Sequence, residues 1–167
     1  MAKIALTVDP EIPVPPGLYG GIERVVEMLI NEYQRLGHEV VLFANKNSKV
    51  SCKLVPFPAD TSTGLNSVFK NTVHLTKHVI FEKFDILHSF SRLSYLSILL
   101  PSSLPIIMSY QRQPTLSQIR KAKMLAKRGT FIVTGCSKYI TDQFKDIVGS
   151  YTVYNGVSLS KYNLSLE

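Results

Sequence analysis

Short apolar segments alternate with helical patterns along most of this chain, and that alternation restricts the possible folds more than any other feature. The run KIALTV at residues 3–8 is followed by a proline-rich loop, a helical pattern over residues 22–36 and the apolar run HEVVLFA at residues 38–44. Apolar strands joined by a helix are typical of parallel pairing, which requires a crossover connection. Residues 3–44 therefore predict a parallel sheet covered by helices.

The same alternation continues as far as residue 154. Further strands are expected at 53–57, 84–90, 104–110, 130–136 and 151–154, and helices at 65–82, 92–100, 115–127 and 138–147. The predicted fold class is α/β, a doubly wound parallel sheet of about seven strands with helices on both faces. Residues 155–167 turn polar and lose periodicity, so residues 1–154 are expected to form one domain and 155–167 to leave it.

The composition is that of an ordinary globular domain. The chain has 167 residues, of which 45% are apolar and 19% charged, enough for one core without a metal or a disulfide. Cys52 and Cys136 lie far apart and are expected to be reduced thiols. The N-terminus MAKIALTVD lacks the apolar core and cleavage site of a signal peptide, so a cytoplasmic location is expected.

Positive charge is concentrated in one segment. Of the 19 basic residues, six fall between Arg112 and Arg128, in a chain with a formal net charge of +7. Such a cluster can attract a phosphate, an acidic surface or a nucleic acid, although a solvated helix face explains it as well. Apolar residues at helical spacing leave open a peripheral contact between 112–128 and an anionic membrane. No nucleic-acid partner is expected, because no recognition motif or interleaved aromatics accompany the charge.

The carboxyl ends of the predicted strands are the expected place for a ligand. Four irregular stretches follow strands there: DPEIPVPPGLYGG, HSFSR, SYQRQPT and GCSKY. Gly20 and Gly21 open the first helix without a side-chain cap, so its free N–H groups can approach a phosphate or hydroxyl oxygen. Glu23 suits the helix dipole but repels a bare anion. A flexible break between loop and helix explains the two glycines equally well.

Several common chemistries lack the residues that they need. Neither the dinucleotide fingerprint nor the phosphate loop with Gly-Lys-Ser/Thr is present, and no paired carboxylates or nucleophile elbow can be recognised. His74 and His78 are one helical turn apart but have no third ligand, so no metal site is expected. His88 follows an apolar strand and either hydrogen-bonds a substrate or is structural. The catalytic residues remain unknown.

Taken in order, five segments resemble the N-terminal half of GT-B glycosyltransferases of the large retaining group 1, family 4. They are PPGLYGGIERVVEMLINEYQRLGHEVVLFA, FDILHSF, LPIIMSYQRQP, IVTGCSKYITDQF and VYNGV. In such enzymes two Rossmann-like domains face each other across a cleft, the N-terminal one mainly binding the acceptor and the C-terminal one mainly the nucleotide-sugar. The resemblance implies hexosyl transfer from a UDP- or GDP-hexose co-substrate to a sugar, lipid or small-molecule acceptor, with no metal and no permanently bound cofactor.

The resemblance also implies site residues. Gly20 and Gly21 would approach the donor phosphate and sugar, His88 and Ser137 would line the cleft, and Asn155 and Gly156 would begin an interdomain hinge. Gln111 stands where the family usually has a His that contacts the donor sugar; it can hydrogen-bond but carries no charge. The full substrate-binding set is Gly20, Gly21, Glu23, His88, Ser109, Tyr110, Gln111, Arg112 and Ser137.

Features of the family's donor domain are missing from this chain. No two of its glutamates are eight positions apart, so the Glu-x7-Glu motif is absent, as is the Arg/Lys pair for the diphosphate. We therefore expect the acceptor-side domain of a longer enzyme, unable to transfer sugar alone because the departing diphosphate is not stabilised. The alternative is a stand-alone sugar- or nucleotide-binding module without catalysis.

Overall fold

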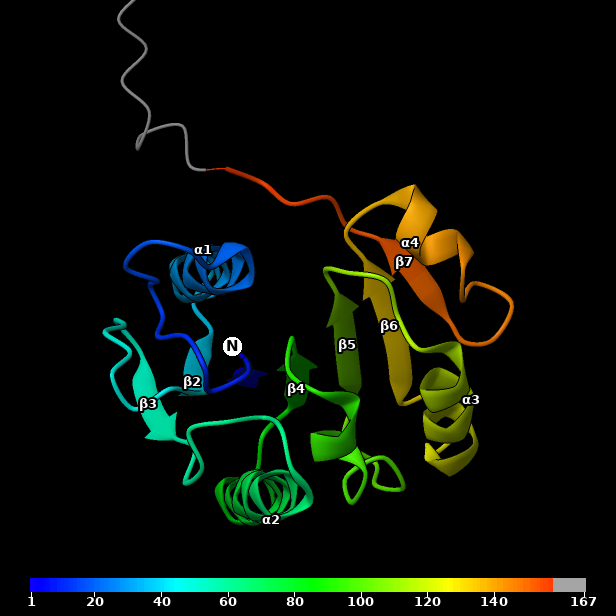
Figure 1. Ribbon diagram of the computed structural model, residues 1–167, viewed down its shortest axis with the longest axis horizontal. Coiled ribbons are helices and arrows are strands. Elements are labelled where there is room, and N and C mark those ends of the chain that lie inside the picture. The colour runs from blue at the N-terminus through cyan, green and yellow to red at the C-terminus, as the bar shows by residue number, and fades with distance from the viewer. Residues whose placement is uncertain (158–167) are drawn as a thin grey trace, which may run out of the picture.

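Seven strands form one parallel sheet in the order β3-β2-β1-β4-β5-β6-β7, as Figure 1 shows. The computed structural model describes residues 1–157. Every neighbouring pair is parallel. The strands are β1 (Lys3–Thr7), β2 (Glu39–Ala44), β3 (Lys53–Pro56), β4 (Ile86–Ser89), β5 (Ile106–Tyr110), β6 (Phe131–Gly135) and β7 (Ser150–Thr152). The predicted fold class is confirmed.

Helices cover both faces of the sheet, and α1 and α2 lie on opposite sides of it in Figure 1. On one face, Val26 and Ile30 of α1 pack in a cluster with residues of β1 and β2. On the other face a larger cluster joins residues of the remaining helical segments, including the buried Leu75 and Ile119. The helical segments are α1 (Gly21–Arg35), α2 (Leu65–Glu82), the 3-10 helix η1 (Leu93–Leu96), α3 (Leu116–Leu125) and α4 (Lys138–Asp142).

Two of the predicted helices are shorter than expected. Only Leu93–Leu96 of the segment 92–100 is helical, and it is a 3-10 helix, in which Tyr95 N–H donates to Arg92 O. In the segment 138–147, α4 ends at Asp142 and turns follow. Segments of about ten residues gain little from their own hydrogen bonds, so packing against the sheet decides how they wind.

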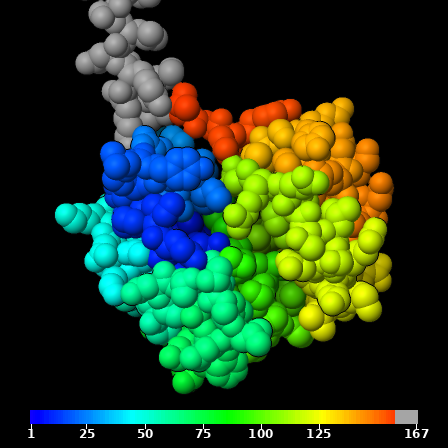
Figure 2. All heavy atoms as spheres, viewed as in Figure 1, coloured from blue at the N-terminus to red at the C-terminus, as the bar shows by residue number. Residues whose placement is uncertain are grey.

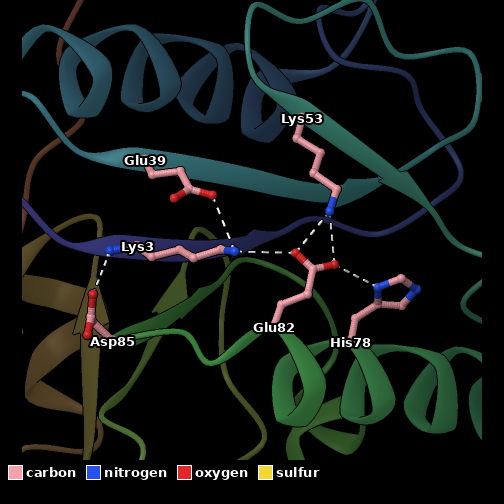
Figure 3. A network of polar contacts seen from close by, with 6 residues as sticks. All are labelled: Lys3, Glu39, Lys53, His78, Glu82 and Asp85. Atoms are coloured by element: carbon pink, nitrogen blue, oxygen red, sulfur yellow. Dashed lines mark hydrogen bonds and ion pairs between the residues drawn. The ribbon is translucent and has the colours of Figure 1, made fainter.

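A network of charged side chains lies at the amino ends of β1, β2 and β3 (Figure 3). The Glu82 carboxylate at the end of α2 accepts hydrogen bonds from Lys53 Nζ at 2.9 and 3.0 Å and from Lys3 Nζ at 3.5 Å. His78 Nδ1 lies 3.1 Å from the same carboxylate. Lys53, followed by His78, lowers the pKa of Glu82 to about 2. The network therefore stabilises this edge, away from the carboxyl ends of the strands.

We expect Glu82→Gln to lower the free energy of unfolding at pH 7 by about 1–2 kcal/mol, a value reduced for solvent screening. Because the pKa is lowered in the folded state, this stabilisation is present above pH 4.5 and is lost as the pH falls towards 2. Urea unfolding at pH 7 measures it. Glu32→Gln, which removes only the exposed pair with Arg35, is the control and should cost about 0.5 kcal/mol or less. Equal effects of the two substitutions would contradict a role for the network.

Candidate functional site

A cavity of about 520 Å³ opens at the carboxyl edge of the sheet, where the topology of a parallel sheet predicts a ligand site. Figure 2 shows the N-terminal segment (blue) beside the segment that precedes α3 (yellow-green), so residues far apart in the sequence share this edge. The segments following β1, β4 and β5 contribute most of its walls. The lining residues include Asp9, Glu11, Tyr19, Gly21, Glu23, Arg92, Gln111, Arg112 and Asn155.

The two glycines at the start of α1 have different roles. Gly20 has φ +148°, and a Cβ there would lie 2.6 Å from Pro16 Cβ and 2.7 Å from Glu23 Oε2. A Cβ on Gly21 would meet nothing within 4 Å, and Gly21 lines the cavity. No side chain caps the helix, so its first N–H groups are directed to this edge. Gly20 is therefore required by packing, whereas Gly21 leaves open space beside the cavity.

The proline-rich loop before α1 is fixed to its neighbours. Val14 N–H donates to Ser48 Oγ at 3.0 Å, and Lys49 N–H donates to Val14 O at 2.7 Å. Nearer the start of the loop, Ser62 Oγ donates to Glu11 Oε1 at 2.6 Å. These bonds hold the loop as a defined wall of the cavity.

Carboxylates and guanidinium groups face each other in this cavity. Burial, followed by the nearby Glu11, raises the pKa of Asp9 to about 6. Asp9 Oδ1 accepts a hydrogen bond from the backbone N–H of Arg92 at 3.0 Å. Burial also raises the pKa of Glu23. A carboxyl group that titrates near neutrality can accept a hydrogen bond from a ligand hydroxyl or share a proton with it.

Sequence reasoning did not single out Asp9, Glu11 or Arg92. All three stand within strand-end stretches that were recognised, DPEIPVPPGLYGG and HSFSR. The signal was therefore available: charged residues among the first few positions after an apolar strand. The sheet brings residues 9 and 92 together because β1 and β4 are neighbours.

His88 belongs to a chain of polar groups on the α1 side of the sheet. Its Nδ1 lies 2.9 Å from Tyr33 Oη, and its Nε2 lies 2.7 Å from Ser109 Oγ. Ser109 Oγ is in turn 2.6 Å from Thr134 Oγ1. Burial lowers the pKa of His88 to about 4, so the imidazole is neutral at pH 7. Both ring nitrogens have protein partners.

A second cavity, of about 590 Å³, lies between α1 and the sheet and is lined by this polar chain. His88, Ser109, Gln111, Asn155 and Gly156 border it, but Gly21 does not. Gln111 also borders the first cavity and accepts a hydrogen bond from Asn155 Nδ2 at 2.7 Å. The structure thus separates His88 and Ser109 from the glycine edge, and Gln111 lies between the two cavities.

A third cavity, of about 510 Å³, lies between η1 and α3. Tyr110, Gln111 and Arg112 border it, and burial raises the pKa of Tyr110 to about 12. Ser137 borders none of these three cavities. Its hydroxyl caps α4 by accepting a hydrogen bond from Ile140 N–H at 3.3 Å.

Residues 1–157 contain neither a cluster of metal ligands nor a helix suited to cross a membrane. No three His, Cys, Asp or Glu side chains within that range are grouped so that they can hold a metal ion. None of the helices in that range combines the length and the apolar character that a membrane crossing requires.

Several solved structures with a similar fold are glycosyltransferases. The glycosyltransferase from Rickettsia africae ESF-5 is 15% identical, with a TM-score of 0.71 over 97% of this chain and 45% of that one. The lipopolysaccharide outer core galactosyltransferase WaaB is 17% identical, with a TM-score of 0.62 over 94% and 46%. Anabaena Alr3699/HepE, solved with UDP and glucose, is 19% identical, with a TM-score of 0.57 over 97% and 46%. The chain spans slightly less than half of each, and these identities show the fold alone, one half of a GT-B architecture.

Comparison of the sequence gives a more specific result. No curated protein matches the chain at a significant level. The sequence profile of Glycosyltransferase Family 4, however, matches residues 19–161, which is most of the chain. That range contains the opening of α1 and the segments that follow β4, β5 and β6. The chain therefore belongs to Glycosyltransferase Family 4.

Proposed function

We propose that this chain is the acceptor-side domain of a retaining hexosyltransferase, acting with a donor-binding domain that these residues do not include. The family match over residues 19–161 is the observation that supports this most strongly. The cavity at the carboxyl edge supports it further, because its carboxylates and guanidinium groups are suited to hydrogen-bonding the hydroxyl groups of a sugar. Catalytic residues of the donor side are expected in the other domain.

The proposed donor is a UDP- or GDP-hexose that binds without a metal ion. Support comes from a GT-B neighbour that was solved with UDP and glucose. In the closed enzyme the N–H groups at Gly20 and Gly21 would approach the donor phosphate, because a helix start carries partial positive charge. His88, Gln111 and Ser137 would face the interdomain cleft, and Asn155 and Gly156 would begin the hinge.

A cytoplasmic location, with peripheral contact to an anionic membrane through residues 112–128, completes the proposal. Ile119 and Ala122 of α3 are buried against the sheet, which accounts for part of the apolar pattern of this helix. Met124 and Leu125 are 84% and 55% exposed and lie among basic residues, which is the arrangement of a helix at a lipid surface. The proposed membrane contact rests on the composition and exposure of residues 112–128, and the proposed location rests on the N-terminal sequence.

Affinity for nucleotides separates this proposal from a stand-alone nucleotide-binding module. We expect residues 1–167 to bind UDP and GDP with a Kd above about 1 mM, because the diphosphate and base contacts belong to the other domain and a Kd of 1 mM corresponds to about 4 kcal/mol. Isothermal titration calorimetry measures this, with a two-domain family-4 enzyme as the positive control. Micromolar binding by this chain would favour the binding module instead.

A further inference from the structure

The cavity between η1 and α3 differs in charge from the cavity at the glycine edge. It is bordered by three cations, Arg92, Arg112 and Lys121, and by no Asp or Glu. The cavity at the glycine edge shares Arg92 and Arg112 with it but is also bordered by three carboxylates, Asp9, Glu11 and Glu23. Because Lys121 adds a third cation and no carboxylate borders the cavity next to α3, that cavity favours an anion.

Arg92 has an unsatisfied donor at this place. Its Nε is buried and has no hydrogen-bond partner among residues 1–157, although the side chain borders the cavity. A buried N–H without a partner is uncommon and costs free energy, so an acceptor oxygen of a ligand or a water molecule that reached this Nε would be stabilised there. Arg112 and Lys121 form no salt bridge with the described carboxylates. Their charges therefore remain available to a ligand.

Neutral polar groups complete the lining. Ser94, Gln113 and Gln118 are exposed and border the cavity, with donors and acceptors that suit sugar hydroxyls. Guanidinium and ammonium groups bind phosphate through charge-assisted hydrogen bonds. Three cations match a doubly charged phosphate better than a singly charged carboxylate.

We propose that this cavity binds the acceptor and that the acceptor is a polyhydroxylated group carrying a phosphate. This inference rests on the proposed function, whose acceptor it specifies. The phosphate belongs either to a soluble sugar phosphate or to the headgroup of a lipid. A lipid headgroup fits the position of Met124 and Leu125 at the end of α3. Both side chains are exposed, and Leu125 borders the cavity, so an apolar surface lies beside the proposed phosphate site.

Titration calorimetry with the 167-residue chain tests this, using inorganic phosphate, glucose, glucose 6-phosphate and vesicles of phosphatidylcholine containing about 20 mol% phosphatidylinositol. We expect glucose 6-phosphate or the anionic vesicles to bind at least about tenfold more tightly than glucose or phosphatidylcholine alone. Arg112→Gln and Lys121→Gln should each weaken that binding about tenfold. Lys123→Gln is the matched control, because it removes the same charge from α3 outside the cavity, and should change the Kd less than twofold.

The outcomes separate this inference from the proposed function. Preference for glucose 6-phosphate identifies a soluble acceptor, and preference for the vesicles identifies a lipid headgroup. Equal affinity for glucose and glucose 6-phosphate without vesicle binding, or equal effects of Lys121→Gln and Lys123→Gln, would overturn the inference and leave the proposed function intact. Micromolar UDP or GDP binding that depends on Arg112 and Lys121 would make this cavity a nucleotide site, and both would then fail.

Discussion

Replacement of Gly20 by alanine should destabilise the fold by about 3 kcal/mol, one of the two largest effects that we expect. The backbone there has φ +148°, which L side chains rarely adopt, and the new Cβ would lie 2.6 Å from Pro16 Cβ. Pro16 belongs to the loop whose hydrogen bonds hold it in place, so it cannot move away freely. Urea unfolding of Gly20→Ala at pH 7 measures the loss.

Gly21→Ala is the matched control, one residue further along. Its Cβ would meet nothing within 4 Å, and Gly21 is the first residue of α1, where alanine fits the helical backbone. We expect no loss of stability, and a gain of up to about 1 kcal/mol because alanine restricts the unfolded chain. A neutral Gly20→Ala, or equal losses in both variants, would contradict the separate roles assigned to the two glycines.

The second large effect concerns the pH dependence of the free energy of unfolding. His88 and Asp9 make opposite contributions to it, which almost cancel in the wild-type protein. Burial lowers the pKa of His88 from 6.5 to about 4, so its contribution to stability is complete above pH 6.5 and is lost as the pH falls towards 4. Asp9 behaves oppositely: its pKa is raised from 3.8 to about 6, so the folded state gains stability as the pH falls through the same range. Each of the two groups changes the free energy of unfolding by at most about 3 kcal/mol over this pH range.

Single variants separate the two contributions. Between pH 6.5 and 4, the free energy of unfolding of Asp9→Asn should fall by about 2–3 kcal/mol, and that of His88→Gln should rise by a similar amount. Asparagine keeps an acceptor for Arg92 N–H, and glutamine keeps hydrogen-bonding groups for Tyr33 and Ser109. The pH slope, not the stability at one pH, is the readout. Parallel curves for the three proteins would contradict both assignments.

The long elements were predictable from the sequence because one apolar stripe repeats several times in each. The helix expected at 65–82 has those bounds in the structure, and the helix expected at 22–36 is displaced by one residue. The short segments 92–100 and 138–147 contain too few turns for their periodicity to define a helix, and tertiary packing sets their winding.

The position of the site was predictable from the sequence, but the contacts between its side chains were not. The carboxyl edge follows from topology alone, and the cavity at that edge contains Gly21, Glu23, Gln111 and Arg112. Hydrogen bonds such as His88 to Ser109 join neighbouring strands, and sequence spacing does not show which residues face each other. For the same reason the hydrogen bond between Asp9 and Arg92 could not be predicted, because the two residues are more than eighty positions apart in the sequence. Gly20 was recognised as unusual, but its contact with Pro16 depends on the path of the loop.

Transfer of radiolabelled hexose from UDP- and GDP-hexoses by residues 1–167 tests the central claim most directly. A cell extract supplies the acceptors, and a two-domain family-4 enzyme in the same extract shows that transfer is detectable. The account predicts no label transferred by this chain above a protein-free blank, because the departing nucleotide diphosphate is stabilised by groups of the other domain. Transfer by this chain alone would contradict it, because an acceptor-side domain would then contain a complete active site.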